Sequence, residues 1–171
     1  SHAEGNETKA SGNYSHAEGY LTKATCTDDD PTSRSSTVAL VKGDYTHAEG
    51  YGTVAYGVAS HAEGCGTKAS GTSSHAEGES TTASGDRSHT EGYNTKATRD
   101  SSHAEGYSTK AIGNSSHSEG WGTTANGNCS HAEGCETTAS GAYSHAEGEG
   151  TLASGDYSHT EGSGTSATTY Y

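Results

Sequence analysis

A histidine and a glutamate two residues apart recur eleven times in this chain, each time within the sequence Ser/Thr-His-x-Glu-Gly. Imidazole and carboxylate groups are ligands for Zn²⁺ and related ions, and a neighbouring His and Glu can also share a proton. A catalytic site normally occurs once, so a pair present in every unit favours an architectural role. The pairs are His2/Glu4, His16/Glu18, His47/Glu49, His61/Glu63, His75/Glu77, His89/Glu91, His103/Glu105, His117/Glu119, His131/Glu133, His145/Glu147 and His159/Glu161.

The spacing of these pairs is a strict repeat. Nine of the ten gaps between successive histidines are 14 residues, and the step from His16 to His47 is 31, which is one period plus an insertion of 17. A short unit repeated so regularly predicts that the units stack on one another. We therefore expect a single domain, 1–171, of eleven repeats interrupted by an insertion at about 26–42. The chain begins and ends on unit boundaries, so we expect it to be a piece of a longer protein.

The composition is too polar for an ordinary core. Only eight residues are Val, Leu or Ile, about 5% of the chain, and Phe and Met are absent. A stack can still be ordered if its coils hydrogen-bond to one another, and association of several chains would help. Half of the 22 acidic residues are the repeat glutamates, and the other half nearly balance nine Lys and Arg. The sequence has no basic cluster that would indicate nucleic-acid binding. It also lacks an apolar run long enough to predict that this segment contacts a membrane.

Each unit fits two short strands and two tight turns. Taking Ser88 to Ser101 as positions 1 to 14, position 4 is always Glu, 5 Gly, 8 Thr and 10 Ala. Position 12 is Gly except at Arg99 and Thr169. We expect strands at positions 1–4 and 8–11, with turns at the two glycines because glycine adopts positive φ without steric cost.

Alternation of side chains along a strand places His and Glu, at positions 2 and 4, on one face. Because the invariant residues are expected inside, the sequence predicts that all eleven His/Glu pairs form a structural core with Thr and Ala. Inner glutamates would stay charged or share protons with histidine, since unpaired buried carboxylates cost several kcal/mol. The small residue at position 3 would then face outward, where another chain could approach.

The unit Ser60-His61-Ala62-Glu63-Gly64, followed by Thr67, Ala69 and Gly71, resembles the head repeat of YadA-like trimeric autotransporter adhesins. That family repeats Ser-Val-Ala-Ile-Gly, then a small residue, Ala and Gly, over 14 residues; here His and Glu replace its two aliphatic residues. The resemblance covers nearly the whole chain outside the insertion.

The resemblance implies an all-β, left-handed parallel β-roll of 14-residue coils in a homotrimer with two further copies. It also implies a non-catalytic role in a surface fibre that contacts a host-surface protein or glycan. The location would be the cell surface, with anchoring in the outer membrane through a region absent from this sequence. The repeat is also similar to those of phage tail fibres, so a tail-fibre shaft is the alternative.

Two surface features stand apart from the repeat. The insertion begins with an acidic loop, Asp28 to Asp30, and ends with an apolar stretch, Val38 to Val41. It could be a hairpin packed on a neighbouring chain, a receptor-contacting loop or, less in keeping with its spacing, a calcium site. At position 6, Tyr93, Tyr107 and Trp121 follow one another in successive coils, which predicts an exposed aromatic strip, either a stacking ladder or a surface contact.

Three other functions use residues of these types: zinc-dependent catalysis, ice binding and metal binding. Zinc deaminases use His-x-Glu with a Pro-Cys-x-x-Cys partner, which the only proline, Pro31, does not supply, so we expect no enzyme and no cofactor. Ice binding would need an exposed threonine array. Metal binding stays open as an alternative, because His and Glu on one strand face could hold Zn²⁺ or Ni²⁺. The candidate ligands are His2, Glu4, His61, Glu63, His75 and Glu77.

Overall fold

The computed structural model describes residues 1–10, 12–20, 23–24 and 44–168. The insertion at 26–42, with its hairpin, receptor-loop and calcium hypotheses, lies outside the described residues. Among those residues, no helix has the length and apolar character needed to cross a lipid bilayer.

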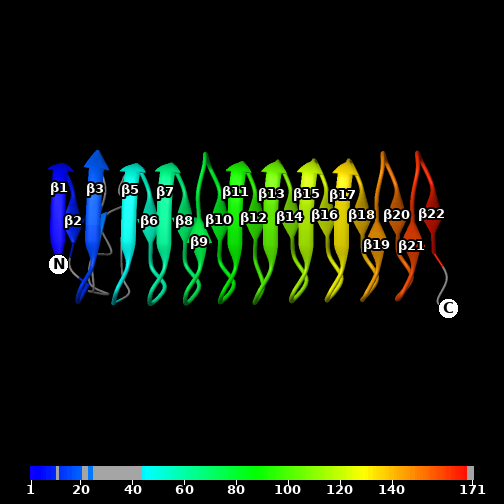
Figure 1. Ribbon diagram of the computed structural model, residues 1–171, viewed down its shortest axis with the longest axis horizontal. Coiled ribbons are helices and arrows are strands. Elements are labelled where there is room, and N and C mark those ends of the chain that lie inside the picture. Colours follow the sequence, from blue (N-terminus) through cyan, green and yellow to red (C-terminus); the bar gives the residue numbers. More distant parts are fainter. Residues whose placement is uncertain (11, 21–22, 25–43, 169–171) are drawn as a thin grey trace, which may run out of the picture.

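The described chain winds into a parallel β-solenoid in which the strands of successive coils lie side by side along one axis (Figure 1). One face of the solenoid is an eleven-stranded sheet. Its strands, in order, are β1 (His2–Asn6), β3 (His16–Tyr20), β5 (His47–Tyr51), β7 (His61–Cys65), β9 (His75–Ala76), β11 (His89–Tyr93), β13 (His103–Tyr107), β15 (His117–Trp121), β17 (His131–Cys135), β19 (His145–Ala146) and β21 (His159–Thr160).

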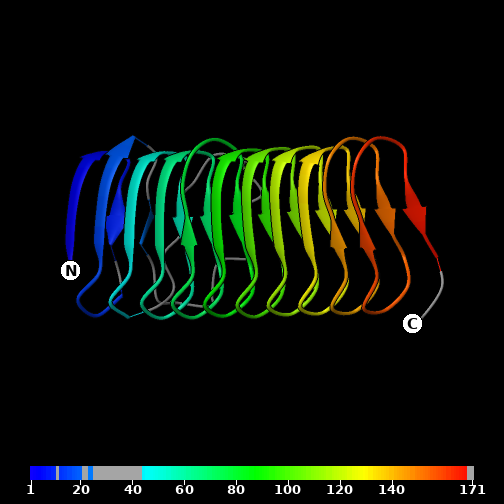
Figure 2. The same cartoon turned by 45° about the vertical axis from the view of Figure 1, so that its right-hand side comes forward.

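The other face consists of two-residue strands, which lie behind the first sheet in Figure 2. A nine-stranded sheet contains β6 (Val54–Ala55), β8 (Lys68–Ala69), β10 (Thr82–Ala83), β12 (Lys96–Ala97), β14 (Lys110–Ala111), β16 (Thr124–Ala125), β18 (Thr138–Ala139), β20 (Leu152–Ala153) and β22 (Ser166–Ala167), and β2 (Lys9–Ala10) pairs with β4 (Lys23–Ala24).

Successive coils are aligned residue for residue at the 14-residue period. His103 pairs with His117 and Glu105 with Glu119 in parallel register. The predicted all-β fold of stacked 14-residue coils is therefore confirmed. The first strand runs from position 2 to position 6 in most coils but ends at position 3 in β9, β19 and β21, and the second strand covers only positions 9 and 10. Left-handed winding and association into a trimer stay predictions.

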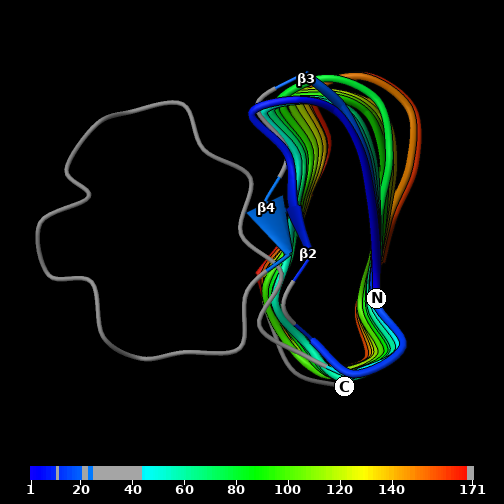
Figure 3. The same ribbon diagram turned by 90° about the vertical axis from the view of Figure 1, so that its left-hand side faces the viewer.

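Seen end on, the backbones of successive coils superpose around one shared interior (Figure 3). Small side chains line this interior. Every buried hydrophobic residue in the described part of the chain is alanine. In one coil, Ala104 at position 3, Thr109 at position 8 and Ala111 at position 10 are each 0% exposed. Thr and Ala at positions 8 and 10 thus point inward as expected.

The prediction that the His/Glu pairs point inward was wrong. The side chains of His103 and Glu105 are each 34% exposed, whereas Ala104 between them is fully buried. An alternating strand has two faces, and the narrow interior admits only the small residue at position 3. Outward glutamates also avoid the cost of losing hydration.

All eleven His/Glu pairs that were predicted to form the core lie instead on the outer face of the long sheet. Six of these residues are exposed rather than buried, and they lie in the terminal coils or in the coils on either side of the insertion: His2, Glu4, Glu18, Glu49, His159 and Glu161. The others are half-buried: His16, His47, His61, Glu63, His75, Glu77, His89, Glu91, His103, Glu105, His117, Glu119, His131, Glu133, His145 and Glu147. The half-buried residues are covered by the side chains of the coils stacked on both sides, and none of the predicted core residues reaches the interior.

Hydroxyl groups bond to the backbone where the coil turns. The Thr123 hydroxyl donates to the carbonyl oxygen of Glu119 at 3.1 Å. The Ser116 hydroxyl at position 1 donates to the carbonyl oxygen of Gly113 at 2.7 Å, and most described coils repeat this contact. The serines at position 1 therefore stabilise the turn before the long strand. At position 8 the hydroxyl makes such a bond in Thr123, Thr137 and Thr165, whereas six other described threonines at this position have no partner: Thr53, Thr67, Thr81, Thr95, Thr109 and Thr151.

The two invariant glycine positions are required for different reasons. Gly120, at position 5, has a φ of +105°, and a Cβ atom there would overlap the backbone of Gly134 in the next coil. Gly113, at position 12, does not have positive φ, contrary to expectation; a Cβ atom there would overlap the carbonyl oxygen of Gly127. Position 12 therefore needs glycine for the close approach of two coils.

Substitution of the position-5 glycine should disrupt the stack. We expect Gly120→Ala to cost about 3 kcal/mol or more, because strain at positive φ adds to a backbone overlap. The matched control is Gly122→Ala, two residues on, where φ is +68° and the nearest atom to an added Cβ is the flexible Glu136 Cγ at 3.6 Å. The control should cost about 1 kcal/mol. Urea denaturation of both variants measures the difference, and equal costs would contradict the close-approach account.

Candidate functional site

The histidines form a continuous stack of rings on the outer face of the long sheet. From His47 to His145, successive ring centroids lie 4.6 to 4.9 Å apart with interplanar angles of 2° to 15°. At the two ends the rings tilt, by 41° between His2 and His16 and by 30° between His145 and His159. The stack follows directly from the in-register pairing of the strands that carry it.

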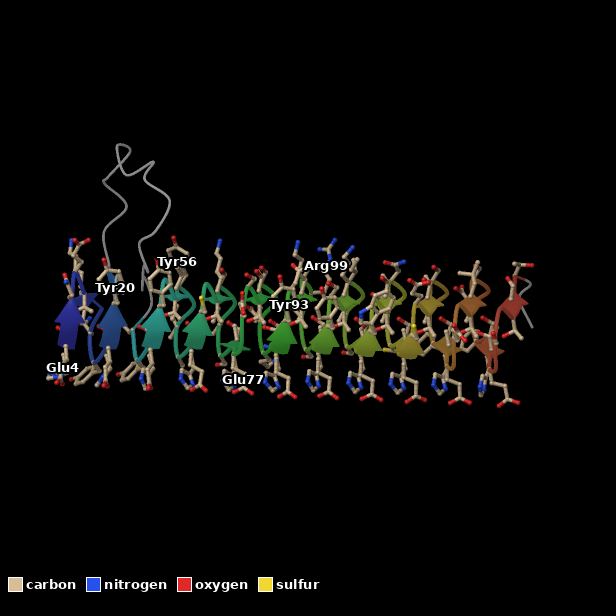
Figure 4. All side chains as sticks on the ribbon, turned by 90° about the horizontal axis from the view of Figure 1, so that it is seen from above. Glu4, Tyr20, Tyr56, Glu77, Tyr93 and Arg99 are labelled. Carbon is tan, nitrogen blue, oxygen red and sulfur yellow. The ribbon has the colours of Figure 1, made fainter. Side chains whose placement is uncertain are left out.

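The glutamates run beside the histidines as a second column. Figure 4 shows Glu4 and Glu77 on one side of the solenoid and Tyr56 and Arg99 on the opposite side. Within nine of the coils, the distance from histidine Nε2 to glutamate Oε2 ranges from 3.4 to 4.0 Å. We call the two columns together the His/Glu ladder.

Imidazoles also contact the carboxylate of the preceding coil. His145 Nε2 lies 3.2 Å from Glu133 Oε1, within hydrogen-bond distance, and 4.0 Å from Glu147 Oε2 in its own coil. His131 Nε2 is 3.9 Å from Glu119 Oε1. An imidazole of the ladder can therefore lie between two carboxylates, one from each of two adjacent coils.

The electrostatics at four histidines of the ladder favour neutral imidazole. Burial lowers the pKa of His61 below its ordinary value of 6.5, and the neighbouring His47 and His75 lower it further, while Glu63 and Glu49 oppose the shift. Burial is likewise the main cause of the lowered pKa of His89, His103 and His131. Protonating one ring disfavours protonating the next, because the rings are stacked closely on one another.

The structure brings together only part of the predicted metal set. One ligand atom each from His61, Glu63 and His75 can lie within 4.8 Å of the others. Glu77 instead groups with His89 and Glu91, which the prediction omitted, and the pair His2/Glu4, 3.4 Å apart, belongs to no such group in the described chain. The repeat itself could have identified His89 and Glu91, because every coil carries the same candidate ligands.

The predicted aromatic strip is exposed and stacked. The rings of Tyr93 and Tyr107 lie 5.0 Å apart at 13°, and those of Tyr107 and Trp121 lie 6.3 Å apart at 9°. All three residues are between 42% and 48% exposed. Because the rings cover one another's faces, mainly ring edges are left for a ligand, which favours the stacking role; a surface contact stays a prediction.

Three further aromatic pairs were not predicted as stacks. Tyr20 and Tyr51, at position 6, stack at 5.6 Å, and the other two pairs lie at position 14 of successive coils. Tyr143 and Tyr157 stack at 5.1 Å, and Tyr14 and Tyr45 at 5.2 Å. Comparing the same position in neighbouring repeats would have found these pairs. Tyr14 and Tyr45 belong to neighbouring repeats although the insertion separates them in the sequence.

No model of a known protein family matches this chain, and no curated protein sequence matches it either.

The lowered histidine pKa values predict that mild acid destabilises the fold. When the folded-state pKa lies below that of the unfolded chain, the unfolded chain binds more protons between the two values, so stability falls as pH falls through 6.5. We expect the melting temperature, followed by circular dichroism, to drop between pH 7.5 and about pH 5, above the range where glutamate protonates. Replacing His61, His89, His103 and His131 by Gln should flatten this dependence. A melting temperature that rises on acidification would contradict it.

Proposed function

We propose that this chain is a non-catalytic rod segment of a trimeric surface fibre, of the kind found in adhesin heads. The observation that carries the proposal is the unbroken in-register stacking of the described coils, which yields a regular rod. At about 4.8 Å per coil, eleven coils extend a fibre by about 50 Å. The resemblance to YadA-like repeats supports placing the fibre at the cell surface, with a host protein or glycan as its partner.

The His/Glu ladder is the face on which we place contact with the two further copies. Its residues are the same in every coil, so copies aligned in register would meet the same groups at each level. In the resembling family the same positions carry aliphatic residues. On the geometry found here those residues would lie on the outer face, and an apolar outer face needs a partner to cover it.

A phage tail-fibre shaft is the alternative within the same class. It would use the rod in the same way, as a spacer of fixed length, and differs only in the particle that carries it. The ladder and the coil geometry support both equally, so the proposal rests on the structural role that they share.

The association of chains can be tested by light scattering. We expect the purified chain to have three times the mass of one 17.3 kDa chain. The double variant Glu105→Lys with Glu119→Lys reverses two charges on the ladder and should give monomers. The matched control, Thr124→Lys with Thr138→Lys, changes position 9 of the opposite sheet, where lysine occurs in other coils.

Two results would contradict parts of the proposal. A monomeric wild-type chain would contradict the trimer. A trimer that survives the ladder variant but dissociates in the control would contradict the choice of face. Circular dichroism of both variants checks that the β-solenoid persists, which we expect because all four substituted side chains point out of the coil.

A further inference from the structure

The ladder contains buried polar atoms that lack partners. The Nε2 atoms of His75, His89, His103, His117 and His131 are buried although their rings are about one-third exposed, and none has a hydrogen-bond partner. A buried nitrogen normally has such a partner, so each of these atoms calls for an explanation. In each case the nearest charged groups are ladder carboxylates.

The distances between these atoms suit a shared cation. Zn²⁺ and similar ions lie about 2.0 to 2.2 Å from nitrogen and oxygen ligands. The separation of 3.4 to 3.6 Å between Nε2 and Oε2 within several coils, including His61/Glu63 and His103/Glu105, would then subtend about 110° to 120° at the ion, close to the tetrahedral angle. Such a separation is long for a hydrogen bond. The 3.9 Å separations between His89 and Glu91, and between His131 and Glu119 of the preceding coil, must shorten by about 0.4 Å to reach the same angle, which rotation of the glutamate side chain allows.

The stacking decides which ligands one ion can take. Parallel rings 4.7 to 4.8 Å apart direct their Nε2 lone pairs side by side, so two adjacent imidazoles cannot both point at one ion without rotating. One imidazole with the carboxylates of its own and the preceding coil needs no ring rotation. Two groups already have this composition, Glu77–His89–Glu91 and Glu119–His131–Glu133, with ligand atoms within 4.8 Å of one another.

We propose that the His/Glu ladder binds a row of divalent transition-metal ions such as Zn²⁺, each held by one imidazole and two carboxylates. The charge supports the composition, because two coils contribute two carboxylates and one divalent ion neutralises both. Three protein ligands leave coordination positions for water or for a group from a neighbouring chain. The sites lie within one chain, so the inference does not depend on the fibre function.

Calorimetric titration of the full chain with ZnCl₂ tests the proposal. The protein is purified without metal-affinity resin and treated with a chelator first. We expect saturable binding of several ions per chain, up to about five if alternate coil pairs are filled. Titration with Co²⁺ should give visible ligand-field bands of a site with nitrogen and oxygen ligands. Absence of saturable Zn²⁺ binding, or Co²⁺ bands no different from those of the aqueous ion, would overturn the proposal.

Matched variants locate the sites. Replacing Glu77, Glu91, Glu119 and Glu133 by Gln retains side-chain size and should remove about two ions per chain. The control replaces four exposed glutamates outside the ladder by Gln, which removes the same charge and should bind Zn²⁺ as the wild type does: Glu7, Glu79, Glu136 and Glu149. Circular dichroism confirms that the variants fold. An unchanged number of bound ions in the ladder variant would place the metal elsewhere and overturn the proposal.

Light scattering of the same samples separates this inference from the fibre proposal. A monomer that binds Zn²⁺ through the ladder supports the metal sites and contradicts the trimer. A trimer that binds no Zn²⁺ supports the fibre proposal and contradicts the metal sites.

Discussion

Backbone hydrogen bonds between identical coils are the interaction on which this structure depends. The amide of His117 donates to the carbonyl of Ser130 at 2.9 Å, and that of Thr124 to Thr137 at 2.9 Å; equivalent bonds recur from coil to coil on both sheets. Alanine methyl groups in the interior bury little apolar area, so they cannot supply the stability of an ordinary core. The same bonds set the spacing at which every other column of side chains repeats, including the stacked imidazoles.

The repeat made most of the fold predictable, but not which face of the long strand points inward. The period, the coil length, the two strands per coil and the inward Thr and Ala all followed from invariant positions. Invariance alone, however, does not distinguish a residue needed inside from one needed on a shared outer face, which is how His103 and Glu105 were misplaced. The size limit at position 3, never larger than Thr90, was the better signal, because a narrow interior restricts volume. Likewise, glycine at position 12 reflects contact between coils, which a single unit does not reveal.

The outward ladder gives the solenoid two chemically different faces. The long sheet carries the acidic column with its half-buried imidazoles, whereas lysines such as Lys68, Lys96 and Lys110 project from the short sheet. Partial exposure lets the glutamates keep water on one side, while the imidazoles separate them from the next coil. Half of the 22 acidic residues are thereby concentrated on one surface, while the other half nearly balance the nine Lys and Arg. This uneven distribution is what makes that surface suited to selective contact, with ions or with other chains.

The direction of the coil-to-coil hydrogen bonds has a mechanical consequence. These bonds run along the long axis, so tension applied to the two ends loads the contacts between coils in series. Each coil touches only its neighbours, and rupture of one contact therefore releases a fixed length of chain without loosening the rest. Outside the repeat that carries the insertion, such a molecule would lengthen under force in equal steps, starting at an end coil, and so would dissipate mechanical work gradually instead of breaking at once.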